Sequence, residues 1–250
     1  MLSRSDDRSL KAISLGTPYA TVMTDIADTP PHFWQEPQDQ NLICGSRVRL
    51  RFILPAAPVA KPTLPRGEGW IHEPKLDGWR VQVHKIGPRV NLLTRGGYDC
   101  TERFSTIAKA LETLPAASVI LDSDIVSIGA NGLPDFAALH RGDRKHLRLY
   151  CFDLMHLDGI DFQLEPLAQR KALLTSQLGI HQNPAIRAVE MFADGERLLT
   201  EAELLGLEGV VSKRIDSAYR SGTRSGWVKA KTAAWRTANA ERFRFFSRDR

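Results

Sequence analysis

From about residue 50 onward, short apolar runs of strand type alternate with segments of helical spacing. Apolar residues alternate on both sides of the Gly87-Pro88 turn and predict a hairpin, with Val81 and Val83 before the turn and Val90 and Leu92 after it. Further strands are expected at residues 119–126, 147–153, 186–191, 210–213 and 227–231. A domain rich in strands is therefore expected.

Three segments have the spacing of amphipathic helices. The first follows Asp99 and Glu102, which form a capping-box pattern, and is ended by Pro115. Its apolar face is expected to contain Phe104, Ile107, Ala108, Leu111 and Leu114. The other two helices are expected at residues 165–178 and 195–205. Periodicity alone thus indicates a mixed fold of helices and strands.

The two ends of the chain lack this regularity. Residues 1–49 show no sustained period and contain Thr29-Pro30-Pro31, so we expect a peripheral or poorly ordered N-terminal extension there. The regular domain is expected to cover residues 50–231. Residues 232–250 are expected to form a basic tail, with arginines at positions 236, 242, 244, 248 and 250.

The composition fits a packed globular chain, with 42% hydrophobic and 25% charged residues among 250. The net charge of +5 favours a polyanionic partner such as nucleic acid, although a moderate basic excess also serves solubility. Cys44, Cys100 and Cys151 form no CxxC pair, so a reducing cytoplasm is expected. No apolar run reaches the ~18–20 residues of a membrane span, so no membrane partner is expected.

Neither of the common phosphate-binding loops, GxxxxGK[ST] and GxGxxG, occurs in the chain. Residues 73–80 instead read Glu-Pro-Lys-Leu-Asp-Gly-Trp-Arg, which contains the pattern KxDGxR. Five further motifs follow it in order: Thr94-Arg95-Gly96-Gly97, Leu121-Asp122-Ser123-Asp124, Phe152-Asp153-Leu154, Glu208-Gly209-Val210-Val211-Ser212-Lys213 and Trp227-Val228-Lys229-Ala230-Lys231.

This ordered set resembles the signature of the covalent nucleotidyltransferases, a superfamily of DNA ligases, RNA ligases and mRNA-capping enzymes. The wording, including Tyr219-Arg220-Ser221-Gly222, is closest to the ligase domain of bacterial end-joining DNA ligases. The resemblance covers roughly residues 50–231 and implies an adenylation domain of the α+β nucleotidyltransferase fold, with antiparallel sheets flanking an ATP cleft. ATP and magnesium, for which manganese can substitute, are the implied cofactors.

Lys75 matches the lysine of KxDGxR, which implies that it attacks ATP and carries AMP as a covalent phosphoramidate. A lysine attacks only as the neutral amine, whereas an exposed lysine has a pKa of about 10.4, so burial, nearby cations or metal must favour that form. By the same resemblance, Arg80 contacts the ribose or the leaving phosphates, and Arg95 the ribose or a 5′-phosphate. For all three, a surface side chain without a catalytic role is the alternative.

The resemblance also implies a metal site at Asp124 and Glu208, because magnesium prefers hard oxygen ligands. Here the chain departs from the family, which has Asp-Gly-Glu where this sequence has Asp122-Ser123-Asp124. Aspartate is one methylene shorter than glutamate and serine has less backbone freedom than glycine, so we expect altered contacts there. A solvated surface carboxylate is the alternative for Asp124.

Four residues are expected around the nucleotide itself. Phe152 matches the aromatic that stacks on adenine, although a core phenylalanine is the alternative, and Glu73 is expected beside the adenine. Lys229 and Lys231 alternate along one strand, so both can face the α-phosphate, although alternating lysines also suit a protected edge strand. The seven histidines show no metal-binding spacing.

The sequence thus predicts an ATP-dependent DNA ligase that seals 5′-phosphate/3′-hydroxyl breaks in nicked or broken double-stranded DNA. Residues 232–250 are too few for the OB-fold that relatives carry after this domain, which leaves three alternatives: a minimal ligase, an incomplete chain, or one that needs an end-joining or OB-fold-bearing partner. An RNA ligase or capping-type enzyme and a non-catalytic DNA-end-binding protein are the alternative functions. We expect a cytoplasmic protein, associated with the nucleoid if the chain is bacterial.

Overall fold

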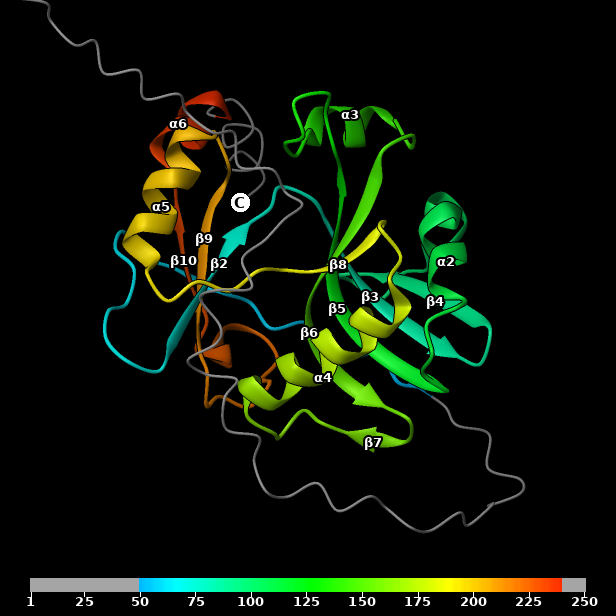
Figure 1. Ribbon diagram of the computed structural model, residues 1–250. Helices are drawn as coiled ribbons and strands as arrows, with labels where there is room; N and C mark the ends of the chain where they lie inside the picture. Colours follow the sequence, from blue (N-terminus) through cyan, green and yellow to red (C-terminus); the bar gives the residue numbers. More distant parts are fainter. Residues whose placement is uncertain (1–49, 240–250) are drawn as a thin grey trace, which may run out of the picture. The chain divides into compact units, whose positions relative to one another are not determined.

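The computed structural model describes residues 50–239, which belong to the second of two compact units, Val48–Arg250. The predictions for residues 1–49 and 240–250 concern segments outside the described residues. Within the described part, strands and helices alternate along the chain, and the strands form two sheets (Figure 1). The expected α+β class is confirmed.

The smaller sheet has four strands in the order β1-β10-β9-β2. Its strands are β1 (Val59–Ala60), β2 (Trp70–Lys75), β9 (Gly209–Arg214) and β10 (Val228–Lys231). The β9 strand pairs antiparallel with both β2 and β10, whereas β1 lies parallel to β10. The sheet therefore unites the KxDGxR segment with the two last motifs, which lie more than a hundred residues further along the chain.

The larger sheet has the order β4-β3-β5-β6-β7, with β8 joined in parallel to β6. Its strands are β3 (Trp79–Ile86), β4 (Arg89–Thr94), β5 (Ser118–Ser127), β6 (Leu147–Leu157), β7 (Ile160–Asp161) and β8 (Ile186–Ala188). The predicted hairpin is confirmed as β3 and β4, and the expected antiparallel sheets are corrected at the two parallel pairs, β1–β10 and β6–β8.

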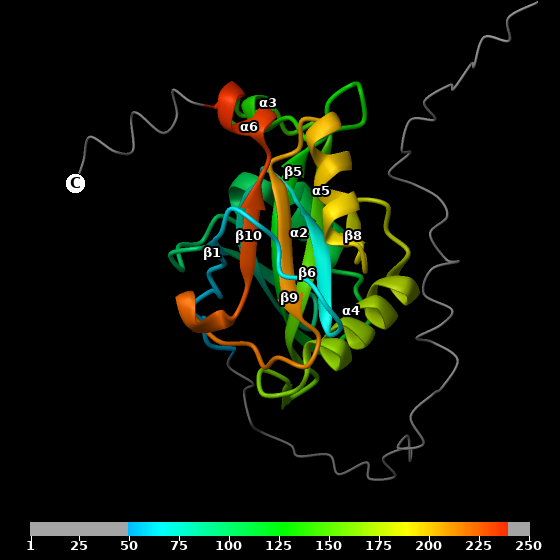
Figure 2. The ribbon, with the colours of Figure 1, turned by 90° about the vertical axis from the view of Figure 1, so that its left-hand side faces the viewer.

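Five α-helices accompany the sheets within the described residues (Figures 1 and 2). They are α2 (Ser105–Leu111), α3 (Phe136–Arg141), α4 (Leu167–His181), α5 (Gly195–Leu204) and α6 (Ala233–Ala238), with short 3-10 turns at Glu102–Phe104 and Thr223–Ser225. The α4 helix packs against β6 and β8, and α5 against β9 and β2. None of the described helices is long and apolar enough to cross a bilayer.

Two local predictions are corrected. The Asp99–Glu102 capping box does not form, because Asp99 accepts the N–H of Thr101 and a 3-10 turn precedes α2, which ends at Leu111 rather than at Pro115. The C-terminal tail begins with a helix, since Thr232 caps α6 by accepting the N–H of Trp235.

The largest apolar core lies within the larger sheet and its helices, and it includes the predicted face of α2. A second cluster joins the two sheets, with Phe152, Val189, Tyr219 and Trp227 among its members. A third, smaller cluster packs α5 on the smaller sheet around Leu198 and Val210. The smaller sheet therefore has less apolar support of its own, and four of its charged residues, Glu73, Lys75, Lys213 and Lys229, line the cavity described below.

Candidate active site

A cavity of about 210 Å³ lies between the two sheets. Its wall contains seven of the nine residues that the sequence predicts for the site: Glu73, Lys75, Arg80, Arg95, Asp124, Phe152 and Lys229. The other two are connected to this group by ion pairs. Glu208 pairs with Lys75, and Lys231 pairs with Glu208. The structure thus brings all nine residues together from five strands and two connections.

Lys75 and Lys231 flank one glycine in the middle strand of the smaller sheet. Lys75 ends β2 and Lys231 ends β10, and both are the direct strand partners of Gly209 in β9. A Cβ atom on Gly209 would lie 2.0 Å from the carbonyl oxygen of Ala230, and its φ of +153° is one that other residues rarely adopt. Only glycine therefore lets the three strands approach at this row.

Glu208, next to that glycine, is shared by the two lysines. Its Oε2 lies 2.9 Å from the Nζ of Lys75 and its Oε1 2.9 Å from the Nζ of Lys231. The side chain of Glu208 is 7% exposed and those of the two lysines 22%, so the cluster is open to solvent on the lysine side. One carboxylate here holds two ammonium groups in fixed positions.

Lys229 adds a third positive charge on the cavity side of β10. Burial lowers the pKa of its ammonium group, and the positive charges of Lys75 and Lys231 lower it further. Arg95, in the turn after β4, is exposed at the edge of the cavity and also acts on Lys229 as a like charge. The wall of the cavity thus contains more cations than carboxylates among the described residues. Such an excess of positive charge suits a bound polyphosphate.

Asp124 lies in β5 and faces this cluster from the larger sheet. Burial raises the pKa of its carboxyl to about 6, although the positive charges of Lys75 and Arg80 act in the opposite direction. Together with Glu208 it offers hard oxygen ligands, which fit a magnesium ion that completes its shell with phosphate oxygens. No group of three or more His, Cys, Asp or Glu side chains within residues 50–239 is arranged to hold a metal by itself.

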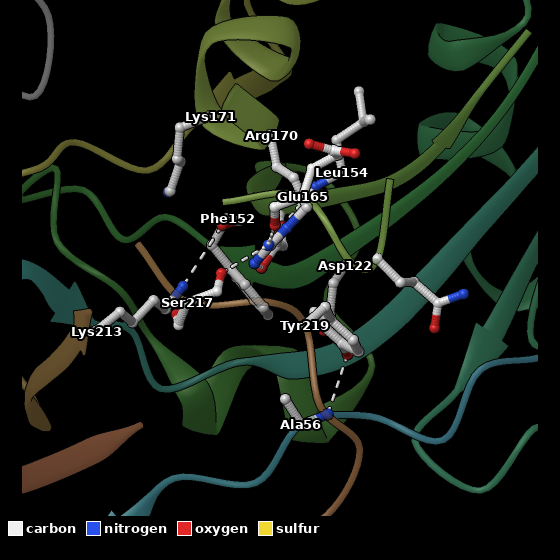
Figure 3. A network of polar contacts seen from close by, with 12 residues as sticks. Ala56, Asp122, Phe152, Leu154, Glu165, Arg170, Lys171, Lys213, Ser217 and Tyr219 are labelled. Carbon is white, nitrogen blue, oxygen red and sulfur yellow. Dashed lines mark hydrogen bonds and ion pairs between the residues drawn. The ribbon is translucent and has the colours of Figure 1, made fainter. Parts of the chain in front are cut away.

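Arg80 is held by a network that the sequence did not reveal. Its guanidinium donates to both carboxylate oxygens of Asp122, at 2.9 and 2.6 Å, and to the carbonyl of Ala56 at 2.5 Å. The Tyr219 hydroxyl donates to the same carboxylate at 2.6 Å and accepts the N–H of Ala56 at 3.0 Å (Figure 3). Burial alone would lower the pKa of Arg80, but Asp122 outweighs it and raises that pKa. Arg80 therefore lines the cavity as a permanently charged, preoriented group.

Phe152 combines the two roles that the sequence left open. It is 8% exposed and belongs to the second apolar cluster, where its ring meets that of Trp227 edge-on at 6.1 Å. It also lines the cavity together with Val189 and Val211. A flat apolar wall of this kind suits a nucleobase.

Glu73, which the resemblance places beside the adenine, lines the cavity and is 3% exposed. Its carboxylate pairs with Lys171 of α4 and, at 2.6 Å, with Lys213 of β9. Lys213 also lies 4.1 Å from the ring centre of Trp227 and donates to the Phe152 carbonyl at 3.4 Å (Figure 3). Both carboxylate oxygens of Glu73 are thus engaged by protein cations, and Lys171 is a site neighbour that no motif contained.

Ser123, which stands where the family has glycine, fits its strand without backbone strain. Outside glycine, a positive φ occurs among the described residues only at Asp158 and Gln182, so the β5 backbone at Ser123 needs no glycine. Its side chain alternates away from Asp122 and Asp124 and meets the buried Cys151, its partner in β6. Of the two departures from the family pattern, only the shorter carboxylate of Asp124 is therefore expected to alter contacts in the site.

Comparisons with known proteins agree with this geometry. Residues 59–231 match the family model of the ATP-dependent DNA ligase domain. The chain is 39% identical over 172 residues to the multifunctional non-homologous end joining protein LigD of Pseudomonas aeruginosa, covering 67% of this chain and 20% of that protein. It is 34% identical over 168 residues to a probable DNA ligase of Beutenbergia cavernae, covering 63% and 33%.

Solved structures show the same relationship. The ligase domain of M. tuberculosis LigD superposes with a TM-score of 0.61 at 27% identity, covering 70% of this chain and 59% of that one. A mycobacterial DNA ligase D complexed with ATP and MES gives a TM-score of 0.60, also at 27% identity, with 70% and 60% covered. The chain spans only a fifth to a third of the length of the two curated relatives. Since the family model covers most of the chain and the cavity joins its motifs, the chain belongs to the ATP-dependent DNA ligase family.

Proposed function

We propose that Lys75 is adenylylated by ATP and that the chain transfers this AMP to DNA ends in order to seal them. One observation carries the proposal: the Lys75 nitrogen lies at the wall of a cavity between the sheets, 2.9 Å from a carboxylate that also holds a second cation. A lysine fixed in this way, with cations on one side and an apolar wall on the other, fits nucleotidyl transfer.

The first step forms a nitrogen–phosphorus bond. Lys75 gives up one proton before attack, for which Glu208 is in place as acceptor, and a second proton to solvent after the bond has formed. The bond between the α-phosphorus and the bridging oxygen breaks, and pyrophosphate leaves. Lys229 and Lys231 place positive charge on the same face of β10, where phosphate oxygens gain charge during transfer.

Asp124 and Glu208 are the side chains that would hold magnesium. When bound, magnesium neutralises the charge of the phosphate oxygens and orients them. Arg80, preoriented by Asp122, would contact the ribose or the leaving phosphates, and Arg95 lies far enough out to meet a 5′-phosphate. Phe152, backed by Trp227, would stack on the adenine.

The later steps use DNA as substrate. AMP passes from Lys75 to a 5′-phosphate, and the 3′-hydroxyl then attacks that phosphate, forms the phosphodiester and releases AMP. The names of two relatives, a probable DNA ligase and a non-homologous end joining protein, favour nicked or broken double-stranded DNA as the substrate. A cytoplasmic location, associated with the nucleoid if the chain is bacterial, is part of the proposal. A partner with an end-joining or OB-fold module is part of the proposal, since one relative is a multifunctional end joining protein of which the chain spans a fifth.

Intact mass after incubation with ATP and magnesium tests the first step. The wild type should gain one AMP, Lys75→Ala should gain none, and Lys109→Ala should behave as the wild type because Lys109 is an exposed lysine of α2. An adduct on Lys75→Ala, or no adduct on the folded wild type, would contradict the proposal.

The polynucleotide specificity needs a second assay. We expect sealing of nicked DNA with ATP, and little sealing of nicked RNA or use of GTP. A wild type that forms the adduct but seals RNA better than DNA would favour the RNA-directed alternative. DNA-end binding without an adduct would favour a non-catalytic protein.

A further inference from the structure

The α6 helix places a tryptophan behind the nucleophile, outside the cavity that would take ATP. Trp235 is 8% exposed, and its indole N–H donates to Asp77 at 3.1 Å, two residues beyond Lys75. The same ring lies 4.0 Å from the Nζ of Lys231. Trp235 thus contacts the segment that carries the nucleophile and the strand that carries the phosphate-facing lysines.

These contacts continue directly to Lys75. Lys231 is held by Glu208 at 2.9 Å, and Glu208 holds Lys75 at 2.9 Å. Lys231 therefore lies between an aromatic face and a carboxylate, which together restrict a long and otherwise adaptable side chain. Without the ring, Lys231 keeps only one of these two restraints, and the position of Glu208 becomes less defined.

The orientation of α6 is set by contacts with α5 and with the backbone at the end of β10. Glu203 of α5 accepts the N–H groups of Ala233 and Ala234, both at 2.7 Å, and so caps the first turn of the helix. Arg236 donates to the carbonyl of Lys231 at 2.8 Å. These bonds hold Trp235 against Asp77 and Lys231, while neither Glu203 nor Trp235 is among the described residues that line the nucleotide cavity.

We propose that Trp235 is a positioning residue for adenylylation: docked through α6, it fixes Lys231 and Asp77 so that Glu208 presents Lys75 to the nucleotide. The proposal rests on the proposed function of Lys75. It predicts that the docking of α6 affects the rate of the chemical step and leaves the affinity for ATP nearly unchanged, because α6 contacts Lys231 while none of its residues lines the proposed nucleotide cavity.

Single-turnover adenylylation at varied ATP tests this prediction. Trp235→Ala should lower the rate at saturating ATP on the order of tenfold, whereas the half-saturating ATP concentration should change by less than about twofold. Trp235→Phe keeps an aromatic ring near Lys231, although a smaller one, and loses the indole N–H, so it should recover part of the rate. A role in folding alone would not produce this split between rate and half-saturation.

A second pair of variants keeps the test independent of the tryptophan. Glu203→Gln weakens the cap of α6 and should slow the same step, whereas Glu201→Gln, on the same helix and paired only with Arg197 in the described part, should not. If Trp235→Ala fails to fold, the adenylylation rate of Glu203→Gln, compared with that of Glu201→Gln, tests the proposal on its own. Wild-type rates in folded Trp235→Ala or in Glu203→Gln would overturn the proposal, and absence of an adduct on the wild type would instead contradict the function of Lys75.

Discussion

Two clusters of the same composition lie along the smaller sheet, each with one glutamate between two lysines, although Lys171 of one cluster comes from α4. In the open cluster, Glu208 holds Lys75 and Lys231, whose side chains are 22% exposed. In the sealed cluster, Glu73 holds Lys171 and Lys213, whose side chains are 3% and 1% exposed. Both glutamates lie close to Lys75 along the strands, so composition and position alone do not distinguish them.

Solvent access separates their roles. A carboxylate in the open cluster can exchange a lysine for a metal or a phosphate-bound ligand, since water can compensate the charges during the exchange. A carboxylate in the sealed cluster cannot leave its lysines without leaving buried charge uncompensated. In the proposed function, the same combination of residue types therefore supports chemistry in the open cluster, whereas in the sealed cluster it holds two strands and a helix together.

Removal of the sealed carboxylate should have the largest effect. Glu73→Gln leaves two buried ammonium groups without their partner, and we expect a loss of about 3–5 kcal/mol in the free energy of unfolding. Urea unfolding followed by circular dichroism measures this change. A loss below about 1 kcal/mol would mean that the cluster is less sealed than the structure shows.

The same change in the open cluster should act on rate instead of stability. Glu208→Gln should slow adenylylation about 100-fold and change the free energy of unfolding by no more than about 1 kcal/mol. Single-turnover mass spectrometry and urea unfolding of the same preparation provide both numbers. Equal effects of the two substitutions on stability would remove the distinction between the clusters.

The smallest expected effect concerns pH. Burial lowers the pKa of Lys213 in the folded protein, although Glu73 acts in the opposite direction. In the pH range below 10.5 and above that lowered pKa, the unfolded chain binds the proton more strongly than the folded protein, so stability rises with pH there. The slope from this one group is at most about 1.4 kcal/mol per pH unit.

Lys213→Met should therefore flatten the rise in stability on the alkaline side, while Lys109→Met on the exposed face of α2 should leave it unchanged. Urea unfolding at a series of pH values measures both. An identical pH dependence in wild type and Lys213→Met would show that burial does not govern the proton of this lysine.

The sequence predicted the open cluster much better than the sealed one. The motifs contain Lys75, Glu208 and Lys231, but their joint position depends on β9 pairing with both β2 and β10 at Gly209, a register that no local pattern contains. Lys171 could not be found at all. It lies in an amphipathic helix where lysines usually face solvent, and only the packing of α4 brings it to Glu73.

Local competition explains the remaining differences. The side chain of Asp99 accepts the N–H of Thr101, two residues further on, and so forms a short aspartate turn in place of the capping box. At residue 232 a threonine followed by two alanines formed a helix where charge alone suggested a tail, and Glu203 from a distant part of the chain completed its cap. In both places the sequence indicated a residue that can cap a helix, but it did not indicate which N–H or which distant side chain would be its partner.

Phe152, Val189 and Trp227 belong at once to an apolar cluster and to the wall of the cavity that we propose for the nucleotide. A base bound there would therefore extend a core that already joins the two sheets. Above the dissociation constant, the free energy of unfolding would then rise with the logarithm of the ligand concentration. The melting temperature becomes a direct titration signal. Nucleotides and base analogues can accordingly be ranked on this protein by thermal shift alone, in the absence of DNA, metal or turnover.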